Sequence, residues 1–198
     1  DLYGPGKPGG EAKLAGESSR TAPKVAVLLG GPSAEREVSL SSGAECAKAL
    51  RQAGYEVIEI DAGRDLPARL AAVAPDVVFN ALHGRWGEDG CVQGLMEWLG
   101  YRYTHSGVLA SALAMDKVRT KQVWQALRLP TPAYVAYQPG HDLAAAIAAI
   151  GYPAIVKPSH EGSSVGISRV FSAGDLPQAI DLASRYDGEL LIERLIEG

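Results

Sequence analysis

Apolar runs alternate with amphipathic segments along the first half of the chain. The segments 24–29 and 76–82 are almost wholly apolar, which is typical of strands buried on both faces of a parallel sheet, and 56–61 predicts a third strand. Apolar residues at helical spacing predict helices over 39–53 and 65–75. Strands that alternate with helices through short connections indicate a doubly wound, Rossmann-like parallel sheet of the α/β class.

Further elements complete this first region, and the pattern changes near Met115. The predicted elements are helices over 91–99 and 107–115 and a short strand at 101–103. From Met115 a charged amphipathic helix runs to the residue before Pro130 and is followed by shorter elements. We therefore expect a domain boundary here.

The second region, 116–198, predicts a different architecture. Short strands and helices are separated by glycine-rich and proline-rich turns, which favours an α+β domain with helices on one face of a sheet. The expected strands cover 134–137, 154–158, 165–170 and a segment from 190, and the expected helices cover 143–150 and 176–186.

The N-terminal stretch differs in composition from both regions. Residues 1–23 are rich in Gly, Pro, Ser and Lys and hold almost no branched apolar side chains, so we expect a disordered leader before a first domain at 24–115. Because the chain begins with Asp1 and stops inside a strand-like segment at Gly198, we expect both ends to be cut.

Composition narrows the class of protein. Among 198 residues, 19 Lys and Arg stand against 23 Asp and Glu, giving a net charge of −4 without a basic cluster, which argues against nucleic acid or a membrane surface as partner. The two cysteines, Cys46 and Cys91, form no metal-binding or disulfide pattern. Without a signal peptide or an apolar run of membrane-spanning length, we expect a cytoplasmic protein.

Two loops follow predicted strands of the first region. In the loop GGPSAERE, Glu35 lies between a strand and a helix, where a carboxylate suits a ligand ammonium; an ordinary turn is the alternative. In the loop HGRWGEDG, His83 follows the strand that ends on the same sheet edge, which favours a shared pocket over a purely structural histidine. For Glu88 and Asp89 we favour capping of the next helix.

The segment IVKPSHEGSSVGISRV carries the most specific pattern of the second region. A lysine that closes an apolar strand, followed by a Ser/Gly turn and a returning strand, is the layout of a loop that folds over nucleotide phosphates. Lys157 would supply the charge, while the turn residues would allow close backbone approach and hydroxyl contacts; these are Gly162, Ser163, Ser164 and Gly166. Lys117, on the charged helix, is by pattern alone more typical of a solvated surface.

Three long segments together resemble one family. KVAVLLGGPSAEREVSLSSG, ALHGRWGEDGCVQGLMEWLGYRYTHSGVLASALAMDKVRTK and GYPAIVKPSHEGSSVGISRV resemble the D-alanine–D-alanine ligases, ATP-grasp enzymes of peptidoglycan precursor synthesis, in order and spacing from Lys24 onward. The resemblance implies that 24–115 is a substrate (pre-ATP-grasp) domain and that 116–198 is an ATP-grasp central domain. It also implies an activity, the joining of two D-alanines through an acyl phosphate with ATP and Mg²⁺ or Mn²⁺.

The resemblance further implies roles for residues that match the family's motifs. Glu35 would hold the ammonium of the first D-alanine, His83 would lie beside its carboxylate, and Ser163 would hydrogen-bond toward Glu35. The residues expected at ATP are Lys117, Lys157, Ser164, Glu193, Leu195 and Ile196. For Lys117 this reverses the solvated interpretation, while Leu195 stands where some relatives carry an aromatic residue.

Some of the family's machinery has no match in this sequence. The resemblance places the metal ligands, the transition-state arginine and a covering loop beyond Gly198, so we expect no metal ligand here and no activity from these 198 residues alone. A homodimer is implied by the resemblance only. Two alternatives remain open: a ligase that makes D-alanyl-D-lactate or another D-dipeptide on the same scaffold, and a non-catalytic module that binds an amino acid or a nucleotide.

Overall fold

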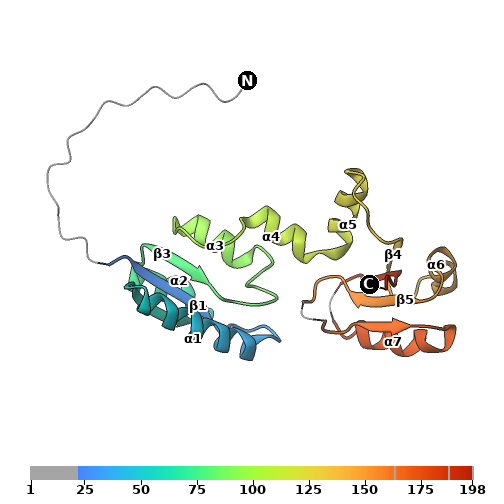
Figure 1. Ribbon diagram of the computed structural model, residues 1–198, viewed down its shortest axis with the longest axis horizontal. Coiled ribbons are helices and arrows are strands. Elements are labelled where there is room, and N and C mark those ends of the chain that lie inside the picture. Colours follow the sequence, from blue (N-terminus) through green and yellow to red (C-terminus); the bar gives the residue numbers. More distant parts are fainter. Residues whose placement is uncertain (1–21, 163, 187, 198) are drawn as a thin grey trace, which may run out of the picture.

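The computed structural model describes residues 22–162, 164–186 and 188–197, so the predicted leader over 1–23 lies outside the described residues except for Ala22 and Pro23. Two sheets form two lobes, and α3, α4 and α5 run from the first lobe toward the second (Figure 1). In chain order the elements are β1 Lys24–Leu29, α1 Arg36–Gln52, β2 Glu56–Asp61, α2 Leu66–Val73, β3 Val77–Asn80, α3 Cys91–Leu99, α4 Val108–Met115, α5 Lys117–Ala126, β4 Tyr134–Tyr137, α6 Leu143–Ile150, β5 Ala154–Pro158, β6 Ser168–Val170, the 3-10 helix η1 Ala173–Asp175, α7 Leu176–Ala183 and β7 Leu190–Arg194.

The first sheet is parallel and has helices on both faces. Its strand order is β2-β1-β3, and β1 is buried along nearly its whole length because it lies in the centre. Leu28 and its neighbours on one face pack against α2 and α3, while Val27 and its neighbours on the other face pack against α1. The doubly wound α/β prediction is confirmed for this lobe.

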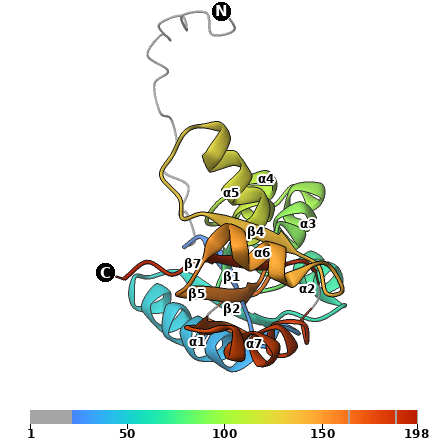
Figure 2. The same ribbon diagram turned by 90° about the vertical axis from the view of Figure 1, so that its right-hand side faces the viewer.

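The second sheet is antiparallel, with strand order β4-β7-β5-β6. Apolar side chains of alternate strand positions, among them Val156 and Ile192, pack against α6 and α7, so both helices cover the same face (Figure 2). Because side chains alternate along a strand, Lys157 and Glu193 belong to the opposite face. The α+β prediction is thus confirmed, and one face of the sheet is left for charged side chains.

Several predicted boundaries are wrong by a few residues. Helix α1 begins at Arg36, one turn before the predicted start, and α7 ends at Ala183. The predicted strand at 101–103 is a single parallel bridge between Val78 and Tyr103. At such places local contacts decide the boundary, and the apolar pattern does not report them.

The predicted domain boundary coincides with a break between two helices. Asp116 has extended backbone angles between α4 and α5, and the domain boundary near Met115 stays a prediction. Among the described residues no helix is long and apolar enough to cross a membrane. Cys46 and Cys91 are both free thiols.

Candidate functional site

The loops after β1 and β3 are joined at the carboxyl edge of the first sheet. The Ser33 hydroxyl donates to the His83 carbonyl oxygen at 2.8 Å, and the Ser39 hydroxyl of α1 donates to the Ala81 carbonyl oxygen at 2.7 Å. These bonds fix the start of α1 against the β3 loop. Glu35 and His83 therefore lie on neighbouring loops of one edge, where ligands of parallel sheets bind.

Glu35 is buried at the start of α1, between backbone segments of both lobes. A Cβ atom built on Gly84 would lie 2.4 Å from Glu35 Oε2, and one built on Gly162 would lie 3.1 Å from the same oxygen. Gly84 also has a φ of +66°, a conformation that side chains disfavour. The absence of side chains at Gly84 and Gly162 thus leaves space for the Glu35 carboxylate. Because Gly162 lies on the loop after β5, this loop of the second lobe reaches the candidate substrate-binding residue of the first lobe.

His83 is held by two side chains. Its Nε2 shares a hydrogen bond of 2.8 Å with the Ser42 hydroxyl of α1, and its Nδ1 lies 3.8 Å from Glu88 Oε1. Glu88 Oε2 accepts from the Gly84 amide at 2.8 Å, so the prediction that Glu88 caps α3 is wrong: its carboxylate turns back toward the histidine loop. Asp89 does reach the first turn of α3, where it accepts from the Cys91 amide at 3.1 Å.

An ion pair ties the β1 loop to the end of β2. Arg36 donates to both carboxylate oxygens of Asp61, at 2.7 and 2.6 Å, and Asp61 also accepts from the Gly31 amide at 3.2 Å. The hydrogen bond from Arg36 lowers the pKa of Asp61 to about 2. This pair stabilises the first turn of α1, directly after Glu35 in the chain, and sequence patterns did not reveal it.

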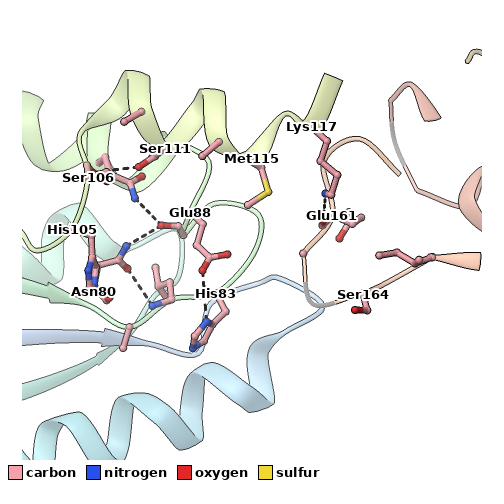
Figure 3. A pocket seen from close by; sticks show the side chains of 18 residues that line it. Asn80, His83, Glu88, His105, Ser106, Ser111, Met115, Lys117, Glu161 and Ser164 are labelled. Carbon is pink, nitrogen blue, oxygen red and sulfur yellow. Dashed lines mark hydrogen bonds and ion pairs between the residues drawn. The ribbon is translucent and has the colours of Figure 1, made fainter. Parts of the chain in front are cut away.

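A cavity of about 610 Å³ lies between the two lobes (Figure 3). His83 and Glu88 line it from the first lobe, whereas Lys117 and Ser164 line it from α5 and the second lobe. The remaining lining residues are Asn80, Ala81, Leu82, Gly87, Gln93, His105, Ser106, Ala110, Ser111, Ala114, Met115, Glu161, Gly162 and Ile167. Of the residues predicted for substrate and nucleotide, His83, Lys117 and Ser164 thus face one space, whereas Glu35 and Lys157 are not among the residues that line it.

Lys117 lies at the N-terminus of α5 and reaches toward the loop after β5. Its ammonium donates to the Glu161 carbonyl oxygen and, at 3.4 Å, to the Ser159 carbonyl oxygen. Asp116 fixes the start of this helix by accepting from the Arg119 amide and the Ser159 hydroxyl, at 3.0 and 3.1 Å. Burial lowers the pKa of Lys117, and the positive charge of Lys157 lowers it further. The solvated interpretation of Lys117 is therefore wrong.

Lys157 and Glu193 meet on the face of the second sheet that lies opposite α6 and α7. Their side chains form an ion pair between β5 and β7, and Glu193 binds a second ammonium, that of Lys121 on α5, at 2.8 Å. Burial pushes the pKa of Glu193 upward, but hydrogen bonds from Lys121 and Lys157 hold it below its ordinary value. Lys121 was missed by sequence reasoning, although it lies one turn after Lys117, on the same helix face.

Among the described residues, the others that are predicted at the nucleotide are not bonded to the lysines described above. Ser164 lines the cavity with a φ of +63°, unusual for a residue other than glycine. Leu195 donates its amide to the Pro153 carbonyl oxygen at 3.0 Å and Ile196 is exposed, and no hydrogen bond within the described ranges joins either to the lysines. Ser163 lies outside the described residues.

Segments of both lobes match family models of the same enzyme family. A family model described as the D-ala D-ala ligase N-terminus matches residues 65–106, and one described as the D-ala D-ala ligase C-terminus matches 123–198. A protein of Ruegeria pomeroyi named D-alanine--D-alanine ligase is 60% identical over 185 residues, which are 92% of this chain and 58% of that protein. The chain belongs to the D-alanine–D-alanine ligase family.

Solved structures of the D-alanine–D-alanine ligase family have the same fold. A crystal structure of the Bacillus anthracis ligase is similar with a TM-score of 0.81 at 34% identity, over 89% of this chain and 59% of that one. The same enzyme complexed with ATP gives a TM-score of 0.79 at 31% identity, over 89% of this chain and 60% of that one. The chain thus spans somewhat less than two thirds of the length of these relatives.

Proposed function

We propose that the protein to which this chain belongs joins two D-alanines to D-alanyl-D-alanine at the expense of ATP. The observation that carries the proposal is the approach of Gly162, in the candidate phosphate loop, to the carboxylate of Glu35. A ligase that activates a carboxylate must hold the amino acid and the phosphate donor side by side. Membership in the D-alanine–D-alanine ligase family supports this choice of substrates.

In this proposal the first lobe holds the first D-alanine. The carboxylate of Glu35 binds the ammonium group of the amino acid, a charge-assisted contact strengthened by burial. His83, held by Ser42 and Glu88, lies beside the carboxylate that is activated. Ser163 would hydrogen-bond toward Glu35 and order the loop, a role that stays a prediction.

ATP supplies the phosphoryl group that activates this carboxylate, and the second lobe holds it in our proposal. Several ammonium groups lie close together here, as a polyanion would require: Lys121 and Lys157 share the carboxylate of Glu193, and Lys117 lies near Lys157 and the carboxylates of Glu161, Asp116 and Glu193. Lys117 and Lys157 bind the phosphates, and Ser164 adds its hydroxyl. Glu193, Leu195 and Ile196 lie on the segment expected beside adenine and ribose. The complex of the similar Bacillus anthracis ligase with ATP supports ATP as the ligand.

Magnesium is part of the proposal only because the resemblance to the D-alanine–D-alanine ligase family implies it. Among the described residues, no three His, Cys, Asp or Glu side chains come together as a metal site. We further propose, on the resemblance alone, that the enzyme works in the cytoplasm as a homodimer in the synthesis of peptidoglycan precursors.

Initial rates of ADP release by the full-length protein test the proposed function. We expect ADP release that depends on D-alanine, with D-alanyl-D-alanine as product, and no comparable rate with L-alanine. Faster product formation from D-alanine plus D-lactate would favour the D-alanyl-D-lactate ligase, and the absence of D-alanine-dependent ADP release would overturn the proposal. The 198-residue chain alone is expected to be inactive in this assay, and D-alanine-dependent ADP release by it would contradict that expectation.

A further inference from the structure

Glu193 is a buried carboxylate shared by two ammonium groups. Its Oε2 lies 2.8 Å from Nζ of Lys121, and its Oε1 pairs with Nζ of Lys157. The Glu193 side chain is 9% exposed. A carboxylate this far from water depends on its charge partners, since a buried ion without one is strongly unfavourable.

The two lysines are held very differently. Lys121 is 6% exposed, and its three N–H groups have three acceptors: Glu193, the Thr131 hydroxyl at 2.5 Å and the Pro132 carbonyl oxygen at 3.2 Å. Lys157 is 19% exposed, and among the described residues Glu193 is its one ion-pair partner. Lys121 is therefore fixed in place, whereas Lys157 has one partner to exchange.

An anionic ligand of Lys157 would compete with Glu193 for the lysine ammonium. If Lys157 turned to a phosphate without another cation present, the buried carboxylate would be left uncompensated. We propose that Lys121 is a positioning residue for ATP: it stays bonded to Glu193 and neutralises that carboxylate while Lys157 turns from Glu193 to the phosphates. The inference rests on the proposed function, because it assumes that ATP is the ligand of Lys157.

The groups around Glu193 determine whether its carboxylate stays ionised, and this gives the proposal a measurable consequence. Across the sheet its neighbours are Tyr134 on β4 and Ile155 on β5, and the charged groups that face it are Lys121 and Lys117 from α5 and Lys157 from β5. Burial favours the neutral carboxyl group, and the two bonded lysines oppose it. Without Lys121, departure of Lys157 would leave burial to dominate, and Glu193 would take up a proton.

Calorimetric titration of the chain with ATP, in buffers of different ionisation enthalpy, measures this proton. We expect Lys121→Met to take up about one proton more per bound ATP than the wild type. Relative to the wild type, its ATP affinity should therefore weaken by up to about tenfold for each unit by which the pH rises. Protons exchanged by ATP itself and by Lys117 contribute equally in both proteins, so the difference between the variant and the wild type removes them. Adding Glu193→Gln to Lys121→Met should abolish the extra proton.

Matched variants separate this role from a general loss of charge or structure. Lys121→Arg, which keeps the cation, should behave as the wild type, and so should Lys48→Met, which removes an exposed lysine of the first lobe. Adenosine, which lacks phosphates, should bind Lys121→Met without extra proton uptake. Circular dichroism checks folding, and Lys121→Gln replaces Lys121→Met if the latter is not folded.

The possible outcomes divide clearly between the two proposals. Equal proton uptake by the wild type and Lys121→Met, or loss of folding in both Lys121→Met and Lys121→Gln, would make Lys121 a structural residue and overturn the inference alone. If the wild-type chain does not bind ATP, the proposed nucleotide site fails, and the inference fails with it.

Discussion

The two lobes hold their candidate binding groups in opposite ways. In the first lobe, Glu35 and His83 lie on loops at a sheet edge and are positioned by backbone contacts and hydroxyl groups. In the second, Lys157 and Glu193 lie within strands and, with Lys121, neutralise one another in a buried ion-pair cluster. We infer that changes in the first lobe should alter ligand binding more than folding, whereas changes in the second should alter both.

The largest expected effect tests the buried cluster. Replacing Glu193 by Ala leaves Lys121 and Lys157 without their carboxylate, so the free energy of unfolding should fall by about 3–5 kcal/mol. Denaturant unfolding followed by circular dichroism measures it. Asp181→Ala, which breaks an exposed pair between Asp181 of α7 and Arg185 just after that helix, should cost far less. Equal losses from both variants would show that the cluster does not stabilise the lobe.

The next effect concerns substrate binding in the first lobe. Glu35→Gln removes the charge expected to hold the ammonium of D-alanine, and we expect the KM for the first D-alanine to rise roughly 30-fold or more in the full-length protein. The KM for ATP should stay within about twofold. Glu37→Gln, an exposed change on the same helix, is the control. A similar rise of both KM values would disprove a role of Glu35 in amino-acid binding.

Comparing alanine substitutions at Gly84 and Gly54 distinguishes the effect of backbone strain from that of a steric clash with Glu35. Gly84 and Gly54 both have a positive φ, of +66° and +90°, so either change to Ala should cost about 1–2 kcal/mol of stability. An added Cβ atom meets Glu35 at Gly84 and meets no atom within 4 Å at Gly54. Only Gly84→Ala should therefore raise the KM for D-alanine. The same KM for both variants would show that Glu35 tolerates displacement.

The smallest effect is a pH dependence of the first lobe. The pKa of Asp61 is lowered to about 2 from 3.8 by Arg36, so its stabilising contribution is present above pH 4 and is lost as the pH falls toward 2. Arg36→Gln should be less stable than wild type at pH 5, and the difference should shrink as the pH falls from about 4 and vanish below about pH 2. Because both side chains are partly exposed, the difference is small. A difference that stays constant with pH would contradict the assignment.

Much of the fold follows from local pattern. The apolar runs at 24–29 and 154–158 predict buried strands, and both occur at these positions. Glu35 and His83 could be assigned to one sheet edge because the carboxyl ends of parallel strands meet there. Lys157 was identified because a lysine that directly closes an apolar strand cannot lie far from the core.

The remainder depends on long-range contacts that no local pattern encodes. Lys121 lies on a helix rich in charges, which by pattern predicts solvent exposure, and its burial results from the docking of α5 against Glu193 of β7. Glu88 has the right spacing for a helix cap, but the Gly84 amide competes for its carboxylate. The pair of Arg36 and Asp61 likewise joins loops that are separate in the sequence.

The central claim is that the two lobes bind separate ligands, and calorimetric titration of the chain with ATP tests it most directly. We predict that the wild type and Glu35→Gln bind ATP with dissociation constants within about twofold of each other, and that Lys157→Met binds at least about tenfold more weakly, because a phosphate loses its ammonium partner. If Glu35→Gln weakened ATP binding as much as Lys157→Met, or if Lys157→Met had no effect, the assignment of amino acid and nucleotide to separate lobes would be wrong.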